Sequence, residues 1–261
     1  MRGIKKHTHS DREKVIREMV PFIKKKFGDN LIALAASGSY ARNEDFAYSD
    51  LELTAFVKKM PRNKPMGGLA KIRDGMLVEM LWMTRETYLK NTLEPNENWH
   101  MSGSDTLLPI LNKKFIEDLG KYRVENLKRK CLDLAVGHFS EVQESVTKVL
   151  NAILQKNRDG IPLLALEMMM QILRVLSFIN QTPLVTFATF MSQAREFAIK
   201  PASFDKLTRI MVKGEYTRLA EFRDTVIAVY SEFEDIFEQL NLELYDDNVD
   251  PNKPVHEFRK L

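Results

Sequence analysis

The sequence predicts an α+β protein made of two parts, an N-terminal part that mixes strands with helices and a C-terminal helical bundle. Three short apolar runs in the first part have the length of buried strands, namely residues 31–37, 50–57 and 75–83. Further along the chain, strand signals nearly vanish and long stretches favour helix. We therefore expect two domains, residues 1–120 and residues 121–261.

The composition is that of a soluble globular protein. The 261 residues are 44% hydrophobic, which is ample for a core, and the formal net charge is only +3. A charge of this size does not call for a nucleic-acid or membrane partner. The single cysteine, Cys131, rules out an internal disulfide and fits a reducing compartment. The stretch MRGIKKHTHS lacks the apolar core of a signal peptide, so we expect a cytoplasmic protein.

The positive charge is concentrated in the first 26 residues. A basic face of this kind is usually exposed to solvent, although it can also favour a nearby polyanion. Its members are Lys5, Lys6, Arg12, Lys14, Arg17, Lys24, Lys25 and Lys26.

The first helix is expected to begin at Ser10. Ser10 followed by Glu13 has the spacing of a capping box, in which each side chain satisfies a backbone donor. Pro21 is expected to kink or restart the helix, and the sequence GDN at 28–30 is expected to end it. The apolar residues at helical spacing are Ile16, Met19, Val20, Ile23 and Phe27.

Three strands are expected after this helix. LIALAAS, residues 31–37, leads into a Gly-Ser turn, and DLELTAFV, residues 50–57, follows a polar loop. GMLVEMLWM, residues 75–83, is the third. The intervening stretch KKMPRNKPMGG is expected to be a loop on its composition.

The second part is expected to be helical throughout. Its most apolar run, residues 161–179, approaches the length of a membrane span. Glu167, Gln171 and Arg174 interrupt this run, so we expect a buried helix of a bundle and no membrane segment. The stretches that favour helix are residues 117–157, 161–180, 186–199, 202–213 and 215–241, and in the last of them one side can be lined by Leu219, Phe222, Tyr230, Phe233, Phe237 and Leu240.

Three acidic residues in the predicted strands indicate a metal site. Side chains alternate along a strand, so Asp50 and Glu52 share one face while Leu51 and Leu53 pack on the other. Two carboxylates held together repel each other, and a divalent cation is the obvious compensation. Glu79, alone among apolar neighbours, completes the cluster if its strand lies beside the second one. Such oxygen ligands suit Mg²⁺ or Mn²⁺, although alternating acids can also simply form the solvent face of a sheet.

The turn before the second strand has features of a phosphate site. Gly38 allows the backbone to approach a ligand closely or to adopt a positive φ. Ser39 offers a hydroxyl and an N–H group, and a helical turn in the YARNE stretch would add further free N–H groups. Arg42 is a planar cation suited to phosphate. A Gly-Ser pair alone is more often just a turn, but beside a carboxylate cluster it indicates a nucleoside triphosphate site.

The stretch GSYARNEDFAYSDLE resembles the signature of the polymerase-beta-like nucleotidyltransferases, and within them it is most similar to the aminoglycoside (kanamycin) nucleotidyltransferases. The spacing from Ser39 to Asp50, the arginine at position 42 and the YSD sequence are shared. The sequence KKFGD, the Val-Glu pair ending at Glu79, Trp99 and the sequence LPI fall in comparable order. The resemblance implies a nucleotidyltransferase domain with a mixed β-sheet and flanking helices, followed by a C-terminal helical bundle.

The resemblance also points to two residues of the helical part. The family carries a glutamate, the proposed general base, and four residues later a lysine that contacts phosphate. Glu144 and Lys148 match that spacing. A Glu-to-Lys pair at this spacing is also the commonest surface pair on a helix, and Glu141 on the same face is the alternative base.

By this resemblance the protein is a Mg-dependent enzyme that transfers a nucleoside monophosphate from ATP or another NTP to a hydroxyl and releases pyrophosphate. The acceptor would be a small molecule such as an aminoglycoside antibiotic, with antibiotic resistance as the role, and the family completes its site across a homodimer. A protein or RNA acceptor, and an inactive nucleotide-binding homologue, are the alternatives. The implied roles are metal binding for Asp50, Glu52 and Glu79, nucleotide binding for Gly38, Ser39, Arg42 and Lys148, and catalysis for Glu144.

Overall fold

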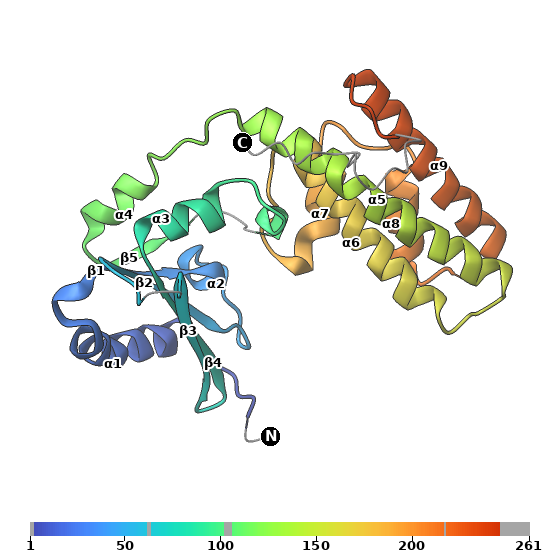
Figure 1. The fold of residues 1–261 in the computed structure, drawn as a ribbon. Coiled ribbons are helices and arrows are strands. Elements are labelled where there is room, and N and C mark those ends of the chain that lie inside the picture. Colours follow the sequence, from blue (N-terminus) through green and yellow to red (C-terminus); the bar gives the residue numbers. More distant parts are fainter. Residues whose placement is uncertain (1–2, 62–63, 102–105, 217, 246–261) are drawn as a thin grey trace. The chain divides into compact units, whose positions relative to one another are not determined.

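The structure is a computed structural model, and it describes residues 3–61, 64–101, 106–216 and 218–245. Its mixed sheet and many helices confirm the α+β prediction (Figure 1). The chain forms two compact units: Met1–Glu94 with Ser104–Glu125, and Pro95–Gly103 with Asn126–Leu261. The predicted boundary between residues 120 and 121 stays a prediction.

The first unit is built on a five-stranded sheet with the order β3-β4-β2-β1-β5. Strands β2 and β4 are parallel, and the other neighbours are antiparallel. The three expected strands are therefore confirmed, and the second and third lie side by side. The strands are β1 (Leu31–Ser37), β2 (Leu51–Val57), β3 (Met66–Arg73), β4 (Met76–Met83) and β5 (Leu108–Leu111).

Part of the expected loop KKMPRNKPMGG is a strand instead. Its last three residues, Met66 to Gly68, begin β3, which pairs with β4 along its whole length. The two strands are joined by Asp74 and Gly75, which have φ values of 48° and 83°. A two-residue Asp-Gly turn with positive φ at both positions is a preferred hairpin connection, so β4 imposes strand structure on a stretch with weak strand propensity.

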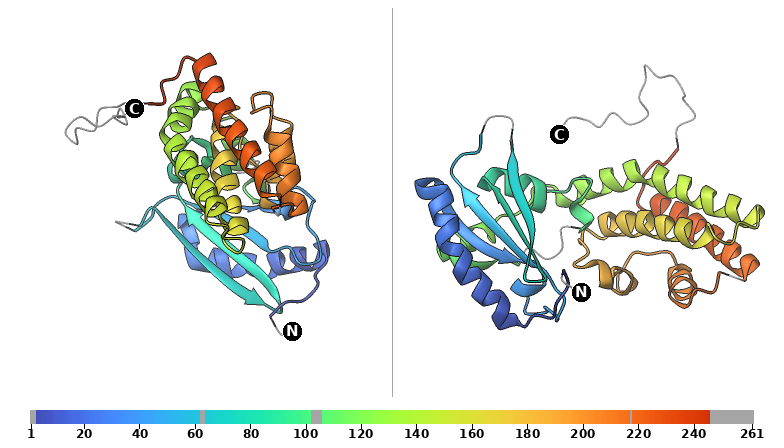
Figure 2. Two further views of the ribbon diagram at one scale, coloured as in Figure 1. Left: turned by 90° about the vertical axis from the view of Figure 1, so that its right-hand side faces the viewer. Right: turned by 90° about the horizontal axis from the view of Figure 1, so that it is seen from below.

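Helices cover both faces of the sheet (Figures 1 and 2). Helix α1 (His9–Phe27) buries Ile16 and Ile23 against one face, together with the expected inward residues Leu51 and Leu53. Short helices α3 (Arg85–Tyr88) and α4 (Lys113–Leu119) pack against the other face around Phe56. The side of the sheet that carries Glu52 is therefore the side opposite α1.

The N-cap residue of helix α1 is Thr8, two residues before the expected one, Ser10. The Thr8 hydroxyl accepts from the backbone N–H of Asp11, and the Asp11 carboxylate accepts from the backbone N–H of Thr8. The capping box is thus formed by Thr8 and Asp11, and the expectation that Ser10 and Glu13 form it is wrong. The helix runs through Pro21 without ending there, and Gly28 caps its end.

The second unit is a helical bundle with its own core. Helix α6 (Ile161–Ile179) is long and apolar enough to cross a membrane by composition, but just over half of it, 56%, is buried inside the structure. Its neighbour α5 (Leu127–Leu154) is shorter than the expected helix over 117–157, because that stretch divides into α4 and α5. Figure 2 shows α5 and α6 running side by side. The remaining helices are α7 (Phe190–Arg195), α8 (Phe204–Lys213) and α9 (Leu219–Gln239), and α9 buries Phe222, Phe233 and Phe237 as expected.

Candidate functional site

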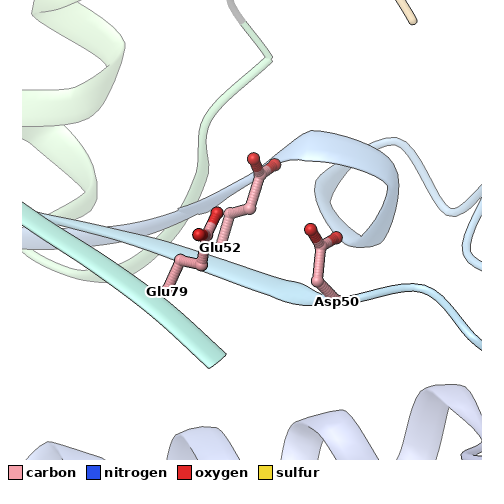
Figure 3. A group of neighbouring side chains, drawn as sticks. All are labelled: Asp50, Glu52 and Glu79. Carbon is pink, nitrogen blue, oxygen red and sulfur yellow. The ribbon is translucent and has the colours of Figure 1, made fainter. Parts of the chain in front are cut away.

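Three carboxylates converge at the start of β2 (Figure 3). Glu52 on β2 lies directly opposite Glu79 on the parallel strand β4, and Asp50 immediately precedes β2. One carboxylate oxygen of each residue lies within 4.8 Å of those of the other two. All three residues are half-buried, and their side chains leave the same face of the sheet. The structure thus brings together the three acids that strand alternation selects.

The mutual repulsion of these acids is visible at Glu52. Burial is the largest cause that raises the pKa of Glu52, and the charges of Asp50 and Glu79 raise it further. Arg42 acts in the opposite direction. A divalent cation held by the three carboxylates would offset their repulsion and favour the ionised form of Glu52. The donor set consists of carboxylate oxygens, which fits Mg²⁺ or Mn²⁺.

Gly38 lies directly against the Glu52 carboxylate. It has φ +66°, and a Cβ atom built on it would lie 1.7 Å from Oε2 of Glu52. A side chain at this position would therefore meet both backbone strain and a steric clash. Gly38 begins α2 (Gly38–Ala41), a helical turn that starts two residues before the YARNE stretch in which one was expected. The backbone of the Gly-Ser turn consequently passes beside the acids.

Ser39 and Arg42 lie on the same turn. The Ser39 carbonyl accepts from the backbone N–H of Glu44 at 2.9 Å. The Ser39 hydroxyl makes no hydrogen bond within the described part of the chain, so it can serve a ligand. The Arg42 side chain is only 13% exposed and pairs with the exposed Glu44 at 2.7 Å. The positive charge of Arg42 lowers the pKa of Glu52, against the effect of burial and of the two neighbouring acids.

A cleft of about 360 Å³ opens on the same face of the sheet. Among the described residues that line it, the acids are Glu52 and Glu79. The small residues Gly68 and Ala70 of β3 form another part of the lining, beside the partly exposed Leu81 of β4. This wall was not foreseen, because β3 was expected to be a loop over its first residues. The full lining is Ser37, Glu52, Leu53, Thr54, Gly68, Leu69, Ala70, Glu79 and Leu81.

Glu144 and Lys148 belong to the second unit, where they form an ion pair on α5 at 3.1 Å. Lys148 also pairs with Glu167 of α6 at 3.2 Å. Hydrogen bonds to both carboxylates raise the pKa of the exposed Lys148. The Glu144 side chain is 66% exposed, so its carboxylate is accessible to solvent.

Glu141, the alternative base, has different surroundings. Its carboxylate accepts from Arg174 of α6 at 2.7 Å and lies 3.2 Å from Nδ1 of His138. His138 in turn stacks on the buried ring of Phe178, with ring centroids 5.7 Å apart. Glu141 therefore takes part in the packing of α5 against α6, and the choice between Glu144 and Glu141 as the base stays a prediction.

The expectation that Arg12 lies on an exposed basic face is wrong. Arg12 is fully buried, and its guanidinium donates to backbone carbonyls of the loop that precedes β2 and to the Asp45 carboxylate. A signal for this was present in the sequence. Arg12 lies four residues before Ile16 and seven before Met19, so it continues the apolar stripe of α1.

The chain is similar to several known proteins over different parts of its length. Residues 114–243 match the family model of the KNTase C-terminal domain. A stretch of 50 residues is 38% identical to a candidate protein adenylyltransferase of Methanocaldococcus jannaschii. It covers 19% of this chain, and the chain spans only 34% of that relative's length. A solved structure of a nucleotidyltransferase-like protein from Exiguobacterium sibiricum 255-15 superimposes with a TM-score of 0.47 and 9% identity over 86% of this chain and 75% of that chain.

Proposed function

Since this chain belongs to the nucleotidyltransferase superfamily and is related to the kanamycin nucleotidyltransferases, we propose that it transfers a nucleoside monophosphate from ATP or another NTP to an acceptor hydroxyl. The observation that carries the proposal is the convergence of Asp50, Glu52 and Glu79 beside the Gly38 turn. In this proposal the three carboxylates hold Mg²⁺ or Mn²⁺. When bound, the metal supplies positive charge to the triphosphate and lowers the pKa of the acceptor hydroxyl.

The chain's own residues then bind the nucleotide and handle the proton. Ser39 and the backbone beside Gly38 bind the β and γ phosphates and orient the α-phosphorus for in-line attack. A bond forms between the acceptor oxygen and the α-phosphorus while the bond to pyrophosphate breaks. Arg42 and Lys148 offset the negative charge on the leaving pyrophosphate. Glu144 takes the proton of the acceptor, which contributes about 10²–10⁴-fold to the rate.

The proposed assembly is a homodimer, by analogy with the family, and the proposed location is the cytoplasm, because the single cysteine fits a reducing compartment. In such a dimer Glu144 and Lys148 can act from either chain. Sedimentation velocity tests this part of the proposal, since a monomer at the concentration of the assay would contradict it.

The first candidate for the acceptor is a hydroxylated small molecule, with aminoglycoside-like antibiotics first by family relation. Aminoglycosides are polycations and need acids beyond those that hold the metal. Within the described lining of the cleft, Glu52 and Glu79 are the acids, and Leu81 exposes an apolar surface. This lining supports an acceptor with fewer positive charges, such as a lincosamide.

The second candidate is a protein hydroxyl. It is favoured by the local identity to a candidate protein adenylyltransferase, a name that describes that relative. An acceptor on a protein needs an open cleft, and the cleft beside the acids lies on the outer part of the sheet, between β2, β4 and the edge strand β3.

The test is pyrophosphate release from labelled ATP with Mg²⁺ and a panel of aminoglycosides, lincosamides and candidate proteins. Release that requires one drug, and that Asp50→Ala abolishes, supports the first acceptor. Label that is transferred only to a protein supports the second. Nucleotide binding without release under every condition contradicts an enzymatic function.

A further inference from the structure

We propose that Arg12 is a positioning residue, which holds the loop before β2 so that Asp50 meets Glu52 and Glu79. The inference rests on the proposed function, because it concerns how the chain presents a metal-binding carboxylate. Residues 42–50 contain no helix or strand, yet they deliver Asp50 to within 4.8 Å of two acids on rigid strands. Something other than backbone pairing must therefore fix this loop.

The Arg12 guanidinium makes the necessary contacts with the loop. Its Nε donates to the backbone carbonyl of Asp50 at 3.3 Å, and its Nη2 donates to the carbonyls of Phe46 at 2.8 Å and Ser49 at 2.5 Å. Its Nη1 donates to Oδ2 of Asp45 at 3.0 Å, and the Asp45 side chain is only 3% exposed. All three guanidinium nitrogens thus bind the segment that ends at Asp50.

The same guanidinium is anchored to the start of α1. Its Nη1 also donates to the carbonyls of Thr8 at 3.1 Å and His7 at 3.3 Å. A buried charge needs such a set of partners to offset its lost hydration. The planar fork of arginine serves several acceptors at once, whereas the ammonium of a lysine is a point charge with a different geometry.

The network also reaches the Gly-Ser turn. His9 of α1 lies 2.7 Å from Oδ1 of Asp45, on the oxygen that Arg12 leaves free. The His9 ring stacks on Tyr40, with centroids 4.4 Å apart and an angle of 14° between the rings. Tyr40 is 5% exposed and directly follows Ser39. One end of α1 therefore holds both the segment that carries Asp50 and the turn that carries Gly38.

The experiment measures Mn²⁺ binding by calorimetry, with no nucleotide and no turnover. Arg12→Met removes the donors and keeps an unbranched chain that matches only the linear part of the arginine side chain, and Arg12→Lys keeps the charge without the fork. We expect both variants to bind Mn²⁺ about 10–100-fold more weakly than the unaltered chain, as is usual when a residue that supports metal ligands is lost. Ile23→Ala is the matched control, because Ile23 is buried on the same helix and has no part in the network. It should lower the melting temperature and leave Mn²⁺ affinity unchanged.

The outcomes separate this inference from the proposed function. If Asp50→Asn abolishes Mn²⁺ binding while Arg12→Met binds as tightly as the unaltered chain, the positioning role is refuted and the metal site stands. If Mn²⁺ binding is absent or independent of Asp50, both proposals fail. Should Arg12→Met not fold, Asp45→Asn takes its place, since it keeps the shape of the side chain and removes the charge that Arg12 faces. We expect it to weaken Mn²⁺ binding as well, and unchanged binding would refute the role.

Discussion

Gly38 carries a steric constraint that can be tested with one methyl group. Alanine at this position would place its Cβ 1.7 Å from Oε2 of Glu52 at a φ of +66°. Gly214 has almost the same φ, +64°, and nothing lies within 4 Å of the corresponding Cβ. Both alanine variants should lose stability by about 1–3 kcal/mol from backbone strain. We expect only Gly38→Ala to abolish Mn²⁺ binding and pyrophosphate release.

Calorimetry and urea unfolding of the two variants check this comparison. A Gly38→Ala variant that binds Mn²⁺ normally would show that the Glu52 carboxylate can move away without loss. Equal loss of metal binding in Gly214→Ala would show that strain, and not the contact, is responsible.

The raised pKa of Glu52 predicts that this residue lowers the stability of the metal-free protein although the proposed activity requires it. A carboxyl group whose pKa is higher in the folded state stabilises the fold while protonated, and this contribution disappears as the pH rises through that folded-state pKa. The metal-free protein should therefore be less stable at neutral pH than Glu52→Gln, which cannot ionise. The gain in melting temperature of Glu52→Gln should shrink as the pH falls towards the ordinary glutamate pKa of about 4.3.

Calorimetric melting in the presence of a chelator, from acidic to neutral pH, measures this effect. Glu125→Gln is the control, because Glu125 is an exposed acid in the loop before α5. A gain that is the same at every pH, or the same in both variants, contradicts the electrostatic explanation. Pyrophosphate release should be lost in Glu52→Gln alone.

The acids of the site could be predicted from the sequence because they depend on local rules. Alternation along a strand places Asp50 and Glu52 on one face, and Glu79 stands out among apolar neighbours. The role of Arg12 depends on a loop more than thirty residues away in the chain, with Asp50 accepting from it across a separation of 38 residues. Contacts between residues so far apart in the chain arise only in the folded protein. The composition of the first 26 residues therefore led to the wrong expectation that Arg12 is exposed.

At the level of the elements, the start of α1 offers a test of its own. Thr8 is the N-cap residue, and Thr8→Ala removes the hydroxyl that accepts from the N–H of Asp11. We expect a loss of about 0.5–2 kcal/mol in the free energy of unfolding. Ser10→Ala should have almost no effect, since Ser10 is exposed inside the first turn. Urea unfolding of both variants measures the two losses. A larger loss of unfolding free energy for Ser10→Ala than for Thr8→Ala would show that Ser10 is the N-cap residue.

The elements that the sequence missed are those whose structure depends on distant partners. The first half of strand β3 contains Gly67 and Gly68, and glycine has low strand propensity. The strand forms because each of its residues pairs with a residue of β4. The Asp-Gly pair at 74–75 was the available signal. The division of the stretch 117–157 had a signal as well, since Gly120 directly follows the end of α4.

At the level of the whole molecule, the segment Pro95–Gly103 belongs to the second unit although the chain then returns to the first. Trp99 is 4% exposed and stacks on Phe178 with centroids 6.0 Å apart. The backbone N–H of Leu184 donates to the carbonyl of His100 at 2.8 Å. The segment therefore supplies part of the core of the helical bundle.

This arrangement predicts a difference between two fragments. A fragment of residues 95–261 keeps Trp99, whereas a fragment that starts at the predicted boundary, residues 121–261, lacks it. We expect the shorter fragment to be less stable by about 3–5 kcal/mol, the usual cost of removing a large buried aromatic side chain. Urea unfolding followed by circular dichroism measures the difference. Trp99→Ala in the longer fragment should reproduce most of it, and equal stability of the two fragments would contradict the prediction.

The direct pairing of Glu52 with Glu79 has a consequence for how the sheet assembles. If β4 were displaced along β2 by one residue, every side chain of β4 would change sides. Glu79 would then lie among the apolar residues that pack against α1, while Val78 and Met80 would lie on the face that carries the cleft. A sheet paired out of register is thus penalised by Glu79, the same acid that the proposed metal site uses, so the correct strand register and the proposed site depend on one residue.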